Sequence, residues 1–120
     1  MKKLLFLLFI ASMFQVNAQT VNGIKLEDIP AKYVEIVSAY KDFKPFQITV
    51  YLDYGQMSSM KEINKGYIIG ADGNSMVFNG TIGVLNTLEK KGFKYLHQYL
   101  FNLGSKDVYH TLLENTNYKE

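Results

Sequence analysis

Alternation of apolar and polar residues marks the two clearest strands of this chain. In the segment 46–54, FQITVYLDY, every second residue is apolar and these residues share one face of an extended strand (Phe46, Ile48, Val50, Leu52 and Tyr54). The segment 33–39 alternates in the same way, with Val34 and Ile36 on one side. Because only KDFKP joins the two segments, the pattern predicts an antiparallel pair of strands.

A helical period replaces this alternation in the segment 80–91, GTIGVLNTLEKK. Ile82, Leu85 and Leu88 recur at spacings that place them on one helical face. Gly92 follows at the position where a glycine commonly ends a helix. The pattern therefore predicts one amphipathic helix of about 12 residues, at about 80–91.

The remaining segments are shorter or more polar. The sequence FKYLHQYLFNLGSKDVYHTLLE contains two apolar runs around a turn, which is typical of a second hairpin, and residues 67–78 predict a smaller hairpin around Asp72-Gly73. We expect a loop at 55–66 and a frayed tail at 115–120. Residues 19–32 are interpreted as a lead-in segment that docks through three apolar side chains (Ile24, Leu26 and Ile29).

This order of elements predicts an α+β fold with two layers. We expect an antiparallel sheet of about four main strands plus the small hairpin, with the helix packed on one face. Residues 19–120 would form a single domain. One helix covers only one face of the sheet, so the other face is expected to be solvated or to contact a partner.

The first 18 residues, MKKLLFLLFIASMFQVNA, have the layout of a secretory signal peptide. Lys2 and Lys3 precede an apolar run, and small or modest residues stand before a cleavage site between Ala18 and Gln19. The apolar run is shorter than the about 20 residues that a transmembrane helix needs. The pattern predicts export to the periplasm or the extracellular medium, with no membrane span after cleavage.

Charge and composition exclude some functions. Two of the 13 basic residues lie in the predicted signal, so residues 19–120 carry 11 lysines against 11 acidic residues and no arginine. Nucleic-acid binding depends on clustered positive charge and on arginine for base recognition, so we expect no nucleic-acid partner. The chain has no cysteine, which excludes disulfides.

The second hairpin contains both histidines and most of the candidate binding residues. If Gly104-Ser105 centres the turn, His97 lies opposite Leu112 and His110 lies opposite Tyr99, so both imidazoles share one face. In that register a stripe of aromatic residues lines this face (Tyr95, His97, Tyr99 and Phe101), while Leu96 and Leu100 point the other way, with Tyr109 and Leu113. If these leucines meet the helix, the aromatic stripe faces outward. A shift of one residue would separate the histidines.

Three hypotheses for function follow. The first is an exported, non-enzymatic binding protein that uses one sheet face. Its partner would be a protein, a peptide, a glycan or a second copy of the chain. This hypothesis depends on the aromatic stripe, because exposed aromatic patches often mark interaction surfaces. The second is a small metal-assisted hydrolase built on His97 and His110 with Asp53 or Asp107 as a further ligand. The third is a structural accessory domain of a cell-envelope assembly. We expect no catalytic motif, no resident metal and no cofactor.

Two resemblances accompany these patterns. The helix followed by Gly92-Phe93-Lys94-Tyr95 and a hairpin resembles a small bacterial domain of unknown function whose signature is Gly-Trp-Glu-Leu-Val, although Phe93 and Lys94 depart from that signature. The segments VNGIKLEDIPAKYVEIV, VFNGTIGVLNTLEKKGF and VYHTLL are similar to parts of short exported proteins of Bacteroidota that have no assigned activity. The resemblance implies export and this order of elements, and it implies no functional residue.

Overall fold

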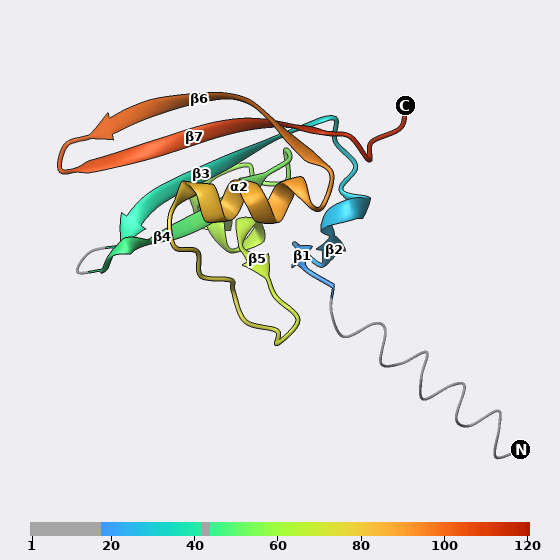
Figure 1. Ribbon diagram of the computed structural model, residues 1–120, viewed down its shortest axis with the longest axis horizontal. Coiled ribbons are helices and arrows are strands. Elements are labelled where there is room, and N and C mark those ends of the chain that lie inside the picture. The colour runs from blue at the N-terminus through green and yellow to red at the C-terminus, as the bar shows by residue number, and fades with distance from the viewer. Residues whose placement is uncertain (1–17, 42–43) are drawn as a thin grey trace, which may run out of the picture.

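The computed structural model describes residues 18–41 and 44–120, so most of the predicted signal peptide lies outside the described residues. Its elements form two antiparallel sheets, one α-helix and two 3₁₀ segments (Figure 1). In chain order they are β1 (Thr20–Val21), β2 (Ile24–Lys25), η1 (Leu26–Asp28), β3 (Tyr33–Lys41), β4 (Lys44–Asp53), η2 (Met60–Gly66), β5 (Ile68–Ile69), α2 (Thr81–Glu89), β6 (Phe93–Leu103) and β7 (Lys106–Asn115).

The main sheet has four strands in the order β4-β3-β7-β6, and every neighbouring pair is antiparallel. The α+β class, the four main strands and the single helix are as the sequence predicts. The central pairing of β3 with β7 joins the first hairpin to the second across more than 60 residues. β4 and β6 therefore form the two edges of the sheet.

One face of this sheet carries the hydrophobic core. Alternate residues of the strands are buried there, as the pattern predicts (Val34, Ile36, Ile48, Val50, Leu52 and Leu113). The helix α2 contributes Val84 and Leu88, and Phe93 at the start of β6 is buried in the same cluster. Tyr54 packs against the cluster, and the side chain of Phe46 lies outside the described part of the chain.

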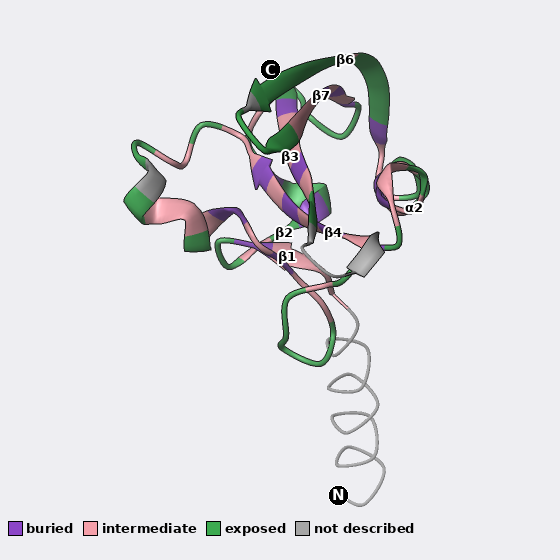
Figure 2. Ribbon diagram, turned by 90° about the vertical axis from the view of Figure 1, so that its left-hand side faces the viewer, coloured by how far each residue is buried: buried purple, intermediate pink, exposed green. Residues whose placement is uncertain are grey.

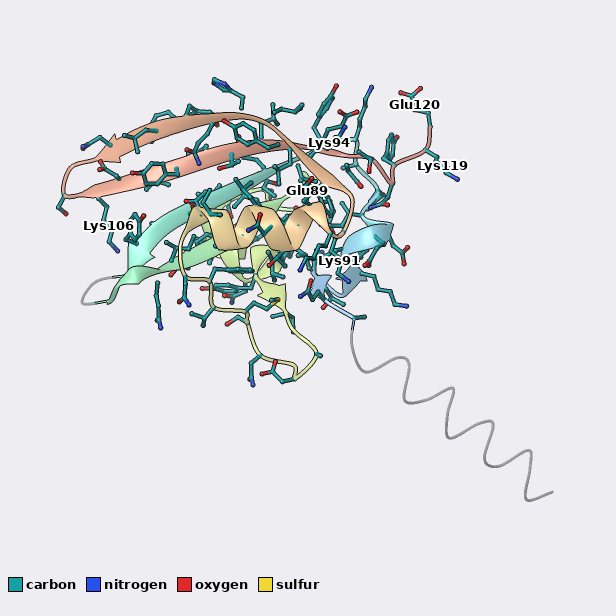
Figure 3. All side chains as sticks on the ribbon, viewed as in Figure 1. Glu89, Lys91, Lys94, Lys106, Lys119 and Glu120 are labelled. Atoms are coloured by element: carbon teal, nitrogen blue, oxygen red, sulfur yellow. The ribbon has the colours of Figure 1, made fainter. Side chains whose placement is uncertain are left out.

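The segment 19–32 is more ordered than a lead-in. β1 pairs with both β2 and β5 in a three-stranded sheet that the sequence does not predict. Docking through Leu26 and Ile29 is confirmed, since both are buried in the core. Lys91, just after α2, lies 2.9 Å from the Glu27 carboxylate, which ties η1 to the helix end (Figure 3). This ion pair holds the pKa of Glu27 below its usual value.

The small hairpin at 67–78 is present as β5 and a bridge between Ile69 and Ser75. The segment 55–66, predicted to be a loop, contains η2.

The expectation that residues 115–120 fray is wrong for Asn115, Thr116 and Asn117. The buried Asn115 side chain donates to two carbonyl oxygens of the segment before β3, and Thr116 and Asn117 donate to the carbonyl oxygens of Gly92 and Lys91. These hydrogen bonds to backbone carbonyl groups hold the three residues in place.

Candidate functional site

The turn of the second hairpin is centred on Gly104-Ser105, since Leu103 pairs with Lys106. His97 therefore lies opposite Leu112, and Tyr99 lies opposite His110. Directly opposite residues of an antiparallel pair share a face. The structure confirms that His97 and His110 lie on the same face of the sheet.

A β-bulge at Leu96 changes the position of Tyr95. Tyr95 pairs with Leu113 and His97 pairs with Leu112, so one residue of β6 has no partner between them. Because Leu112 and Leu113 are consecutive, Tyr95 and His97 point to opposite faces. The prediction that Tyr95 belongs to the aromatic stripe is wrong, because the alternation cannot reveal a one-residue insertion.

Leu100 lies on the face opposite the rings, as predicted, since it pairs with Tyr109, but neither Leu96 nor Leu100 is buried against the helix. Leu96 is the bulged residue, and both leucines are exposed. The buried residues of α2 pack in the same cluster as Phe93, at the start of the strand. The rest of β6 therefore extends past the helix and is exposed on both faces (Figure 2).

Three rows of residues cross β3, β7 and β6 on the face opposite the core. They are Glu35, Leu112 and His97; Val37, His110 and Tyr99; and Ala39, Val108 and Phe101. Four rings gather here, and we refer to them together as the aromatic face (His97, Tyr99, Phe101 and His110). Four of the five residues predicted from sequence thus come together, and Tyr95 does not.

Each ring of the aromatic face contacts at least one other ring of this face. Tyr99 stacks on His110 with ring centroids 4.8 Å apart and an angle of 12° between the planes. Phe101 meets His110 edge-on at 5.4 Å and Tyr99 edge-on at 5.9 Å. His97 extends the stack beyond Tyr99 at 6.5 Å. These separations match the preferred geometry of aromatic pairs, so the rings support one another.

Glu35 on β3 holds the centre of this cluster. The Tyr99 hydroxyl donates to Glu35 Oε2 at 2.8 Å, and His110 Nδ1 lies 2.7 Å from Glu35 Oε1. A carboxylate only accepts hydrogen bonds, so His110 Nδ1 is the donor in this contact. The hydrogen bond to Glu35, followed by burial, raises the pKa of Tyr99 above its usual value. The Glu35 carboxylate therefore holds the Tyr99 and His110 side chains in place.

Most residues of β6 on the aromatic face are exposed, whereas most of those of β3 and β4 on this face are half-buried. Tyr67 forms a bridge to Tyr51 on β4, and the two rings lie 5.0 Å apart, so this segment packs against the β4 end of the sheet. Tyr99 and Phe101 stay exposed, Phe101 to 53%. Figure 2 shows β6 exposed along most of its length, whereas β3, on the other side of β7, has alternating buried residues.

A cavity of about 260 Å³ lies elsewhere, along β4. Uncharged residues of β4 and of the segment 67–77 line it (Ile48, Thr49, Val50, Tyr51, Tyr67, Ser75, Met76 and Val77). Burial, together with a hydrogen bond to Tyr67, raises the pKa of Tyr51 to about 12. None of its lining residues belongs to the aromatic face.

The metal-assisted hydrolase hypothesis needs a third ligand beside the two histidines. Within residues 18–41 and 44–120, no three histidine, aspartate or glutamate side chains lie close enough together to hold a metal ion. Glu35 bonds His110, but its other oxygen accepts from Tyr99. The described helices include none that is long and apolar enough to cross a membrane.

Sequence reasoning missed Glu35. Its only signal is a carboxylate in the middle of an alternating strand, on the face opposite Val34 and Ile36. Its role depends on the pairing of β3 with β7, which sequence periodicity does not specify.

Comparison with known proteins gave no match among protein-family models, curated proteins or solved structures.

Proposed function

We propose that this chain is an exported, non-enzymatic binding protein whose aromatic face engages a protein or peptide partner. The observation that carries the proposal is the Glu35-anchored stack of Tyr99, Phe101 and His110 on an open sheet face. The apolar run and cleavage pattern of residues 1–18, and the resemblance to exported proteins, support the export.

Preorganisation supports a binding role. A side chain that is already fixed loses less conformational entropy when a partner binds, and each rotamer-rich side chain otherwise costs about 0.5–1.5 kcal/mol to immobilise. Tyr99 and His110 are each held by a hydrogen bond to Glu35 and by mutual stacking. Exposed and fixed aromatic rings are the typical anchors of protein interfaces.

The shape of the face supports a macromolecular partner. Small-molecule sites are concave and enclose most of the ligand, whereas protein interfaces are broad and enriched in aromatic residues. The rings of the aromatic face come from β6 and β7, and none of them lines the cavity along β4. Around the rings, Val37, Val108 and Leu112 are half-buried apolar neighbours, which extend the contact surface.

A pair of β6 variants tests the proposal. Tyr99→Ser combined with Phe101→Ser removes two exposed rings of the aromatic face, while Tyr95→Ser removes an exposed ring from the opposite face of the same strand. Immobilised wild-type protein and both variants are used to capture proteins from the envelope and medium fractions of the producing cells. We expect a partner on the wild type and on Tyr95→Ser but not on the double variant.

Direct titration of the captured partner then measures how much affinity each variant loses. Loss of two aromatic anchors should weaken the affinity at least about tenfold, because hot-spot truncations typically cost more than about 1 kcal/mol each. Circular dichroism and thermal unfolding verify that all three proteins fold. The proposal fails if partner capture is the same for the double variant and the wild type, or if Tyr95→Ser reduces it equally.

A further inference from the structure

The two edges of the main sheet differ in how they are protected. On the β4 edge, Ile48 bridges to Phe78 and Tyr51 bridges to Tyr67, and the strand begins with Lys44-Pro45. On the opposite edge, no strand within the described ranges 18–41 and 44–120 pairs with β6, whose only partner there is β7. β6 is also the longest strand, with 11 residues. Figure 1 shows it as the outermost strand of the sheet.

The outer half of β6 lacks the features that normally prevent edge pairing. Natural edge strands are interrupted by charges, prolines or bulges. Residues 97–103, HQYLFNL, contain no lysine, acidic residue or proline, and the bulge at Leu96 precedes them. Lys94 lies at the other end of β6, and Lys106 lies beyond the turn (Figure 3). This leaves a regular, uncharged strand edge.

This edge is complementary to itself. In an antiparallel pair centred on Leu100, Leu100 lies opposite its own copy, Tyr99 lies opposite Phe101, and Gln98 lies opposite Asn102. Leucine thus meets leucine, ring meets ring and amide meets amide, which are favourable cross-strand pairs. The two residues of each pair also come from the same face of the sheet. Tyr99 and Phe101 lie on the aromatic face, and Gln98, Leu100 and Asn102 lie on the other.

We propose that a second copy of this chain pairs with β6 about a two-fold axis at Leu100, which joins the two main sheets into one continuous antiparallel sheet. A two-fold interface must be self-complementary, and the sequence around Leu100 meets that condition. The pairing covers Leu100, which is 52% exposed, and places Tyr99 of each copy beside Phe101 of the other. The two aromatic faces then form one surface.

The dimer is a separate proposal from partner binding. Strand pairing uses the edge of β6, so the aromatic face remains open in the dimer. Leu100→Lys places two like charges opposite each other at the axis but leaves Tyr99, Phe101, His110 and Glu35 unchanged. This variant therefore breaks the dimer without removing any residue of the aromatic face.

Analytical ultracentrifugation of the purified protein tests the association. We expect the wild type to shift from monomer to dimer with rising concentration, and Leu100→Lys to raise the dimer dissociation constant at least about tenfold. A wild type that stays monomeric, or a dimer that Leu100→Lys leaves unchanged, overturns the proposal. Partner capture by Leu100→Lys tests the aromatic face separately. If this variant loses the dimer but still captures the partner, both proposals are supported.

Cysteine cross-linking tests the register. The chain has no cysteine, so each variant introduces a single thiol. Opposite Cα atoms of antiparallel strands are about 4.5–5.5 Å apart, within the range for a disulfide, so Leu100→Cys should form a disulfide-linked dimer under mild oxidation. Phe101→Cys should not, since its two copies are offset by two residues along the strands, which puts their Cα atoms about 8 Å apart.

A mixture of Tyr99→Cys and Phe101→Cys proteins provides the matched control. These positions lie opposite each other in the proposed register, so the mixture should give the mixed disulfide dimer. Equal cross-linking of Leu100→Cys and Phe101→Cys, or absence of the mixed product, overturns the register.

Discussion

Replacement of Asn115 by alanine tests how the C-terminal segment stabilises the domain. The Asn115 side chain is 2% exposed, and its amide donates to the carbonyl oxygens of Ile29 at 3.0 Å and Ala31 at 2.9 Å. Its own oxygen accepts from the Asn117 N–H at 3.1 Å. One buried amide therefore joins the end of β7 to the segment that leads into β3.

The expected cost follows from which groups lose a partner. Removing one partner of a buried hydrogen bond costs about 1–3 kcal/mol, because the remaining group stays desolvated. The Ile29 oxygen keeps a hydrogen bond from the Ala31 N–H, so the Ala31 oxygen bears most of the loss. We therefore expect Asn115→Ala to lower the free energy of unfolding by about 2–3 kcal/mol.

Urea denaturation followed by circular dichroism measures this change. The midpoint should fall while the slope stays constant, since the surface exposed on unfolding is almost the same. Asn86→Ala, at an exposed position of α2, is the control and should change stability by no more than about 0.5 kcal/mol. A loss below about 1 kcal/mol for Asn115→Ala would show that the carbonyl groups find other partners and would refute the reasoning.

Two further predictions concern Gly92 and Tyr51. Gly92 has φ +92°, and an added Cβ would lie 2.5 Å from Asn117 Nδ2, so Gly92→Ala should lower the free energy of unfolding by about 2 kcal/mol or more in the same assay. An added Cβ at Gly83 in α2 meets no atom within 4 Å, so the control Gly83→Ala should leave the stability unchanged or raise it. Equal effects of the two substitutions would contradict this prediction. The pKa of Tyr51 is raised to about 12, so the folded state holds this proton more tightly than the unfolded chain does; the resulting stability is present below about pH 10 and is lost as the pH rises toward 12. The urea midpoint should therefore fall further between about pH 10 and pH 12 for the wild type than for Tyr51→Phe. An equal fall for the two proteins would contradict the raised pKa of Tyr51.

Periodicity predicted the elements that are amphipathic. The alternation in 33–39 and 46–54 identified β3 and β4 together with their buried faces. The spacing of Ile82, Leu85 and Leu88 identified α2, although Ile82 is exposed and Val84 is buried in its place. β1 and β2 have two residues each, which is too short for any period to be visible. Their position depends on tertiary contacts, because Val21 and Leu26 are buried against residues that are distant in sequence.

The candidate site was predicted in part. The turn at Gly104-Ser105 fixed the register of the outer half of the hairpin, and with it the grouping of His97, Tyr99 and His110. The error at Tyr95 arises because a bulge adds one residue without any distinctive sequence at Leu96. Glu35 could not be placed, since its contacts with Tyr99 and His110 span 64 and 75 residues.

The bulge at Leu96 also divides β6 into two parts with different roles. Before it, Phe93 is buried beneath α2 and anchors the strand to the core. After it, residues 97–101 have rings on one face and Leu100 on the other, and most of these side chains are exposed. An isolated hairpin is marginally stable in water, so this part depends on the pairing of β7 with β3 and on the Glu35 contacts. Within residues 18–41 and 44–120, apolar side chains are exposed on both faces of this part and along an edge that no other strand pairs, and this arrangement supports the proposed association.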